Sequence, residues 1–238
     1  MASFETYESS SDDDEVEFEV EQFKIAGYEF GITTVAFMPI TKLLKLNQTA
    51  TEISGQKVWC GSLGIAELML AAQDRIMGKH VVELGAGTGI LGMLCMRLGA
   101  ARVCLTDHDE RSLEHMRADC PRNNVDAHVM RLDWFTPSLD GLDLTGDAGG
   151  LVVIAGDVVY KTALVEPFMR TVALLLASAP GSVFYLCHIP RGGPRVEHAL
   201  VEEGATAQGL AWEILSEESW KRGSCLDTNY VPPEDVNR

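Results

Sequence analysis

Hydrophobic and polar positions follow two regular spacings along most of the chain. Short apolar runs, typical of buried strands, are followed by stretches in which apolar residues recur every three or four positions, as on one face of a helix. The runs predict strands over residues 80–84, 102–106, 127–132, 151–155, 182–188 and 211–215. The longer spacing predicts helices over residues 65–76, 90–98, 113–120, 168–175 and 196–207.

This alternation of strands and helices predicts an α/β fold. We expect a Rossmann-like, doubly wound, mostly parallel sheet with helices on both faces. An additional N-terminal β-hairpin is predicted by apolar residues that alternate about a turn at Gly27, namely Phe23, Ile25, Tyr28, Phe30 and Ile32. The chain then divides into an acidic disordered tail (1–22), the hairpin with a linker (23–56) and the α/β domain (57–238).

Composition and charge narrow the class of protein. The 238 residues are 46% hydrophobic, enough for one sizeable core, and no stretch approaches the ~18–20 apolar residues of a membrane span. The net charge is −16, and residues 1–23 hold nine acids but neither Lys nor Arg. The chain offers no basic stripe for phosphates, so we expect neither tight nucleic-acid binding nor a membrane partner. The acidic surface favours a basic protein partner.

The cysteines and the N-terminus indicate the compartment. Six cysteines lie far apart without a Cys-x-x-Cys pair, and no basic region followed by an apolar run marks a secretory signal. We therefore expect reduced, mostly buried thiols and no bound metal in a cytoplasmic protein, with the nucleus as a further location. We also expect a monomer.

The strongest chemical signal is Val81-Val82-Glu83-Leu84-Gly85-Ala86-Gly87-Thr88-Gly89, a buried strand that runs through alternating glycines into a helix. Glycine allows the sharp turn and the close approach of a ligand. Dinucleotide-binding proteins hold a pyrophosphate with a related pattern, Gly-x-Gly-x-x-Gly. Residues 87–92 match that pattern, but they are out of register with the end of the strand. A glycine turn without a ligand is a third interpretation.

Glu83 distinguishes the two classes of cofactor. A carboxylate at the end of the strand would repel a pyrophosphate, whereas it would suit a ligand with an ammonium group. S-adenosylmethionine has no phosphate and carries an amino-acid moiety. We therefore predict that Glu83 faces the ammonium of this methyl donor, and we keep a nicotinamide dinucleotide as the less favoured alternative.

Acidic residues also follow the next two strands. Asp107 comes 22 residues after Gly85, the spacing at which a carboxylate commonly accepts hydrogen bonds from both ribose hydroxyls. This feature supports a nucleoside without choosing between the cofactors. Asp133 and Trp134 follow the third strand, where a carboxylate suits the adenine amine and an indole can cover the ring. A tryptophan in this position is also common in a core.

Asp157 and Tyr160 follow the fourth predicted strand, 151–155. A carboxylate that attracts an ammonium and a phenol that orients it would together hold an amine nucleophile. A surface aspartate beside a packing tyrosine is the alternative. Trp59, just before the first long helix, is either core or a cover for the glycine loop. His188, after the fifth strand, is interpreted as structural.

Taken together, these motifs resemble those of the seven-β-strand methyltransferases of family sixteen, most of whose characterised members methylate protein lysines. The resemblance covers residues 23–215 and is carried by Val58-Trp59 with Ser62, Glu83 to Gly89, Thr106-Asp107, Asp133-Trp134 and Gly156-Asp157-Val158-Val159-Tyr160. It implies that residues 57–238 form a class I methyltransferase domain that uses S-adenosylmethionine.

The resemblance also implies roles for individual residues. It makes Asp157 and Tyr160 the catalytic pair at the substrate channel, and it gives cofactor contacts to Trp59, the loop Gly85, Ala86 and Gly87, Asp107, Trp134 and Gly156. The expected function is methyl transfer to a lysine of a protein substrate. The alternatives are a small-molecule or N-terminal amine methyltransferase, and a non-catalytic cofactor-binding module that mediates interactions.

Overall fold

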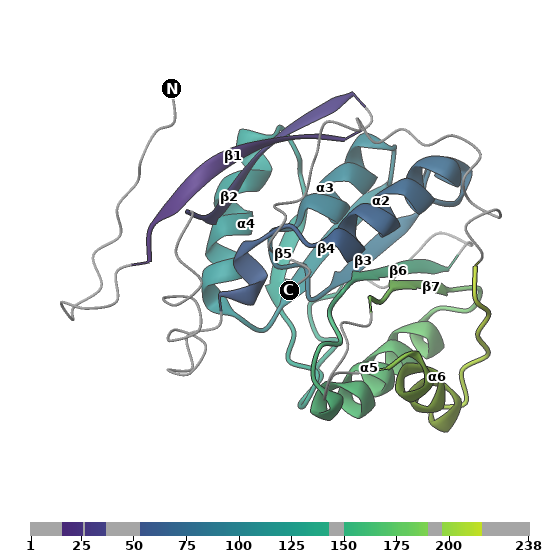
Figure 1. The fold of residues 1–238 in the computed structure, drawn as a ribbon. Helices are drawn as coiled ribbons and strands as arrows, with labels where there is room; N and C mark the ends of the chain where they lie inside the picture. The colour runs from purple at the N-terminus through teal and green to yellow at the C-terminus, as the bar shows by residue number, and fades with distance from the viewer. Residues whose placement is uncertain (1–15, 26, 37–52, 143–149, 190–196, 216–238) are drawn as a thin grey trace.

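A five-stranded sheet lies at the centre of the protein, in the order β5-β4-β3-β6-β7 (Figure 1). The computed structural model describes residues 16–25, 27–36, 53–142, 150–189 and 197–215. All neighbouring strands in this sheet are parallel. The strands are β3 (His80–Leu84), β4 (Arg102–Asp107), β5 (His128–Arg131), β6 (Leu151–Gly156) and β7 (Val183–Cys187).

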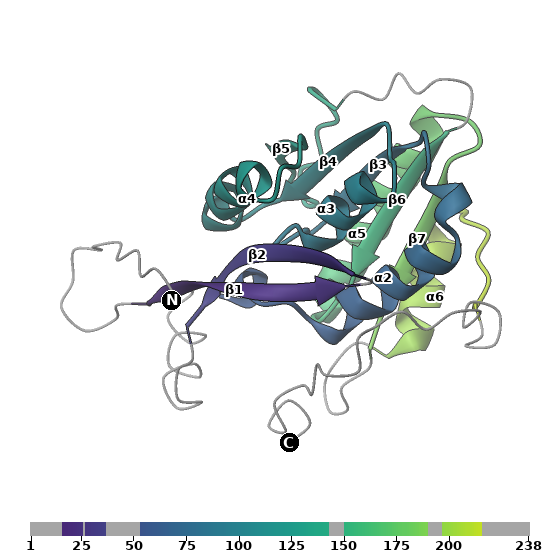
Figure 2. The same ribbon diagram turned by 90° about the horizontal axis from the view of Figure 1, so that it is seen from above.

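Helices cover both faces of the sheet, so the predicted doubly wound α/β fold is confirmed (Figures 1 and 2). One face carries α2 (Cys60–Ala71), α3 (Ile90–Arg97) and α4 (Glu110–Arg122), and the other carries α5 (Val165–Ser178) and α6 (His198–Ala207). Because strand residues alternate, Val81 packs in the core on the α2–α4 side and Val82 in the core on the α5–α6 side. The strand order reverses between β3 and β6, which places the ligand crevice at their carboxyl ends.

The predicted N-terminal hairpin is present as an antiparallel pair that turns at Gly27. Its first strand begins at Phe18, so the predicted boundary of the acidic tail at residue 22 was wrong. The reason is that Phe18 and Val20 alternate with acids, a pattern in which a charged strand face can remain partly solvated. Glu21 accepts a hydrogen bond across the hairpin from the Thr34 hydroxyl at 3.0 Å. The strands are β1 (Phe18–Ile25) and β2 (Tyr28–Val35).

The hairpin is held to the domain by the end of helix α4. The side-chain amide of Asn123 accepts from the Gly31 N–H at 2.8 Å and donates to the Gly31 carbonyl at 2.9 Å. Asp119 accepts from the backbone N–H and the hydroxyl of Thr33, at 2.7 and 2.8 Å. The two side chains thus satisfy backbone groups of β2 that a third strand would otherwise bind.

The strand predicted over residues 211–215 is absent, so this prediction was wrong. These residues follow α6 without regular structure, and their apolar side chains are exposed, with Ile214 at 75% and Trp212 at 48%. The Trp212 indole instead donates to the Thr206 hydroxyl on α6 at 3.1 Å. A short apolar run forms a strand only where a neighbouring strand binds its backbone, and sequence alone does not reveal that neighbour.

Some expectations fall outside the described residues, including those for residues 1–15 of the tail and for Cys225. Within the described ranges, no helix is long and apolar enough to cross a membrane, and no group of three or more His, Cys, Asp or Glu side chains is placed to hold a metal ion. The five cysteines in these ranges are free thiols, of which Cys95, Cys104 and Cys120 are buried.

Candidate functional site

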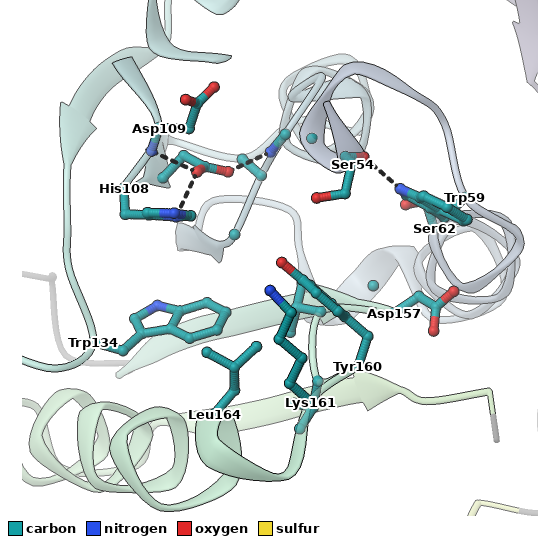
Figure 3. A pocket seen from close by; sticks show the side chains of 18 of the residues that line it. Ser54, Trp59, Ser62, His108, Asp109, Trp134, Asp157, Tyr160, Lys161 and Leu164 are labelled. Carbon is teal, nitrogen blue, oxygen red and sulfur yellow. Dashed lines mark hydrogen bonds and ion pairs between the residues drawn. The ribbon is translucent and has the colours of Figure 1, made fainter. Parts of the chain in front are cut away.

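A cavity of about 870 Å³ opens at the carboxyl ends of the strands, where the strand order reverses (Figure 3). Its volume lies in the range of small-molecule sites. Ten of the eleven predicted site residues line it: Trp59, Gly85, Ala86, Gly87, Asp107, Asp133, Trp134, Gly156, Asp157 and Tyr160. The exception is Glu83.

The glycine loop between β3 and α3 forms one wall of the cavity. Gly85 and Gly87 have φ angles of +62° and +53°, a region that other residues rarely adopt. The Gly87 N–H donates to the Asp107 carboxylate at 2.9 Å, which ties the loop to the end of β4. A Cβ at Gly87 would lie 2.7 Å from the Gly55 carbonyl oxygen, so the loop also requires glycine for the close approach of residues 54–56.

Asp107 and Asp133 lie on the cavity wall with their carboxylates only partly used. The second oxygen of Asp107 accepts from the Asp109 N–H at 3.0 Å and lies 3.3 Å from His108 Nδ1. In Asp133, one oxygen accepts from the Phe135 N–H at 2.9 Å. A carboxylate offers about four acceptor sites, so both residues keep capacity for hydroxyl or amine donors of a ligand.

Trp134 is part of the core and also borders the cavity, the two positions that the sequence left open. Its ring packs against Phe168 of α5 with a centroid distance of 4.7 Å, and Phe168 is fully buried. The same ring borders the cavity, where a Cβ at Gly85 would come within 3.2 Å of it. Trp134 therefore anchors the β5 loop in the core while presenting an aromatic edge to the site.

Glu83 does not reach the cavity, so its predicted contact with the cofactor was wrong. The alternation of β3 directs its side chain towards α3, where Oε2 accepts from the Gly92 N–H at 2.8 Å. Glu83 is only 3% exposed, and burial raises its pKa to about 8, opposed by the Gly92 hydrogen bond. The carboxyl group links β3 to the first turn of α3, and it provides no argument about the charge of the ligand.

Asp157 occupies a strained position after β6. Its φ angle is +59°, its side chain is buried, and its backbone N–H donates to the Cys187 carbonyl at 2.8 Å. A Cβ at Gly61, in the first turn of α2, would lie 2.4 Å from the Asp157 Cβ. Strain of this kind is commonly retained at functional sites. The close contact with α2 fixes the position of the carboxylate.

Tyr160 and Lys161 project into the same cavity from the segment that follows Asp157. Figure 3 shows the Tyr160 hydroxyl and the Lys161 nitrogen pointing towards its middle, between Trp134 on one side and Trp59 on the other. The Lys161 ammonium lies 5.2 Å from the centroid of the Tyr160 ring, within the range of a cation–π contact.

A short segment before α2 covers the glycine loop; the sequence offered this position only for Trp59, as one of two interpretations. The indole of Trp59 donates to the Ser54 carbonyl at 2.7 Å, which closes the segment on itself. The buried Gln56 amide donates to the Ser112 hydroxyl at 2.8 Å, and its oxygen lies 2.5 Å from His115 Nδ1. Residues 54–59 are thereby attached to α4.

Sequence reasoning also missed lining residues that carry charge or can titrate. Lys57, Lys161 and His188 border the cavity, although His188 had been interpreted as structural. His188 contacts His198 of α6 edge-to-face with a centroid distance of 5.4 Å, which agrees with a packing role as well. Single charged residues in loops have no periodicity, and of these three only Lys161 adjoins the Asp157–Tyr160 motif in the sequence.

Comparison with known proteins gives a family match over most of the described domain. A family model described as lysine methyltransferase matches residues 40–215. The histone-arginine methyltransferase METTL23 of Xenopus laevis is 30% identical over 62% of this chain and 62% of its own length. The protein N-lysine methyltransferase METTL21A of Danio rerio is 29% identical over 56% of this chain and 60% of its own length.

A solved methyltransferase structure is similar to part of this chain. The 16S rRNA N2 G1207 methyltransferase of T. thermophilus, in complex with AdoMet and guanosine, gives a TM-score of 0.47 at 20% identity over 79% of this chain and 45% of that one. The chain spans 46–62% of the length of the first curated relatives that it matches.

Proposed function

The chain belongs to the lysine methyltransferase family, and from this premise we propose that it transfers a methyl group from S-adenosylmethionine to a lysine side chain of a protein substrate. The observation that carries the proposal is that the glycine loop and the Asp157–Tyr160 pair line one cavity. A donor site and an acceptor site open into the same space.

The residues present fit the cofactor. The free acceptor positions of Asp107 suit ribose hydroxyls, and the ring of Trp134 with the Asp133 carboxylate suits an adenine. The loop Gly85–Gly87 and Gly156 place backbone rather than side chains against the ligand. S-adenosylmethionine, when bound, supplies a methyl group on a positively charged sulfur, already activated towards a nucleophile.

The chain itself contributes orientation and the exclusion of water. Asp157 is buried and fixed by α2, so its carboxylate can attract the acceptor amine while Tyr160 orients it. An amine must lose its proton before it can attack, and a nearby positive charge disfavours the protonated form. A strong base is therefore not required. Alignment of this kind can contribute ~7–11 kcal/mol to a reaction between two bound groups.

We expect the methyl acceptor to lie in a basic segment of a protein. The net charge of −16 complements a basic target, and the relatives named above act on histone arginine and on protein lysine. The cavity also admits the alternatives of a small molecule or an N-terminal amine, because the donor site does not define the acceptor. We favour lysine because the family model carries that description.

The first test identifies the amino acid that receives the methyl group. Purified protein is incubated with methyl-labelled S-adenosylmethionine and a cell extract, and hydrolysed protein is analysed for methylated amino acids. We expect methyl-lysine. Label found only in methyl-arginine or in small molecules contradicts the proposal.

Asp157→Asn removes the charge but keeps a side chain that tolerates the φ angle of +59°. We expect it to lose at least about a hundredfold in turnover, the order expected for ~3 kcal/mol of lost stabilisation, while it still binds S-adenosylhomocysteine. The exposed Asp126→Asn is the matched control and should behave as the wild type. Wild-type turnover in Asp157→Asn would exclude the assigned role.

A further inference from the structure

The side chain of Lys161 lies where an acceptor amine is expected. In the proposed function, Tyr160 orients the acceptor nitrogen. The Lys161 ammonium is 5.2 Å from the centroid of the Tyr160 ring. Both residues line the cavity, and Figure 3 shows their polar ends directed to its middle. An amine of the chain itself therefore lies beside the side chain that would orient a substrate lysine.

The local backbone explains how Lys161 can take this position. The carbonyl of Lys161 accepts from the Leu164 N–H at 3.0 Å, which fixes its main chain at the start of the 3-10 turn Thr162–Leu164. The residue is exposed, and its four-carbon stem has several rotatable bonds through which the ammonium can reach the cavity. A fixed Cα beside the cavity suits a residue that reacts within its own site.

We propose that Lys161 is itself a methyl acceptor, so that the enzyme methylates its own chain at this position. The inference rests on the proposed function, because it uses the same donor. The Lys161 ammonium first gives one proton to water. Its nitrogen lone pair then forms a bond to the methyl carbon while the carbon–sulfur bond breaks, and the electron pair of that bond stays on sulfur. The product is methyl-lysine, and one proton is released for each transfer.

The first experiment locates the label. Purified full-length protein is incubated with methyl-labelled S-adenosylmethionine alone, and its peptides are analysed by mass spectrometry. We expect label at Lys161, at a rate per molecule that does not change on dilution, because donor site and acceptor belong to one chain. Lys161→Arg should lose this label, whereas Lys24→Arg, on the exposed face of the hairpin, should keep it. Label at other lysines only, or a rate that falls on dilution, overturns the inference.

The second experiment does not depend on activity. Lysines of the cofactor-free protein are methylated chemically with ¹³C-formaldehyde and a borohydride reductant, and the Lys161 resonance is assigned by its absence in Lys161→Arg. Addition of S-adenosylhomocysteine should shift this resonance and leave that of Lys24 in place. An unmoved Lys161 resonance, with cofactor binding confirmed by calorimetry, overturns the inference and leaves the proposed function standing. Absence of S-adenosylhomocysteine binding overturns both.

Discussion

The carboxyl group of Glu83 is buried, and its protonation therefore affects the free energy of unfolding. Burial raises its pKa to about 8, from an ordinary value of 4.5. Between these two values the unfolded chain releases the proton and the folded chain keeps it, so the contribution of Glu83 to stability falls as the pH rises through this window. Below pH 4.5 both states are protonated, and above pH 8 both are ionised.

Glu83→Gln keeps the size of the side chain and an acceptor for the Gly92 N–H, but it cannot ionise. We expect its free energy of unfolding, relative to the wild type, to increase from pH 5 to pH 8 and then to level off. Urea denaturation at several pH values measures this difference, and other titrating groups cancel because both proteins share them. Parallel curves for the two proteins would show that Glu83 is already ionised in the folded state.

The sequence predicts the position of a site residue when that residue lies at the end of a strand. Asp107 is the last residue of β4, and Asp133 and Asp157 follow β5 and β6; parallel strands bring their carboxyl ends to one edge. Glu83 lies within its strand, where alternation decides its direction, and the expected ligand misled the interpretation. Lys161 carried no pattern of its own and became visible only through its contact with Tyr160.

Helix α2 illustrates how an element positions a site residue. Gly61 lies against the backbone and Cβ of Asp157, which cannot move without displacing the end of β6. Gly64, one turn further along, faces only the side chain of Cys187, where a Cβ would be 2.8 Å from Sγ and 3.7 Å from the Cys187 Cβ, and the thiol could rotate. Replacement of either glycine by alanine raises helix propensity by about 1 kcal/mol.

The two alanine variants should therefore differ in activity. We expect Gly61→Ala to displace Asp157 and to reduce methyl transfer strongly, while Gly64→Ala retains most of it, because only the first meets backbone. Methylation rates and circular dichroism of both variants provide the measurement. Equal activities would mean that the contact between α2 and Asp157 does not set the position of the carboxylate.

The regular elements were predictable because each satisfies its own periodicity. Strands β3, β4 and β6 are short and mostly apolar, as expected for buried parallel strands. Helices α4 and α5 bury one face each, whereas α3 is buried on all sides from Ile90 to Cys95. Residues 211–215 show the same kind of run without forming a strand. The segment 54–59 has no periodicity, and hydrogen bonds to α4 determine its conformation.

At the scale of the whole molecule, the N-terminal hairpin is attached to the α/β domain through helix α4. Asn123, at the end of α4, holds both backbone groups of Gly31 in a buried contact. Phe18 of β1 also contacts His115 of the same helix, with a centroid distance of 4.7 Å. The hairpin was predictable from alternation, but its docking depends on polar side chains distant in sequence, which no local pattern reveals.

Asn123→Ala should weaken this attachment. It leaves the N–H and carbonyl of Gly31 without their side-chain partner, and we expect a loss of about 1–3 kcal/mol in the free energy of unfolding. Arg117→Ala, on the same helix, removes only an exposed ion pair with Glu110 and should cost less than about 1 kcal/mol. Urea denaturation compares the two variants. A similar loss in both would show that Asn123 does not hold the hairpin.

The proposed function requires that the cavity beside the glycine loop binds a sulfonium nucleoside and not a dinucleotide. Calorimetric titration of the purified protein with S-adenosylhomocysteine and, separately, with NAD tests it most directly. We expect one site per chain for S-adenosylhomocysteine and no binding of NAD. In Asp107→Ala the affinity for S-adenosylhomocysteine should fall about tenfold or more, by loss of a charged hydrogen bond worth ~1.5–3 kcal/mol. Tight binding of NAD with no heat from S-adenosylhomocysteine would contradict it.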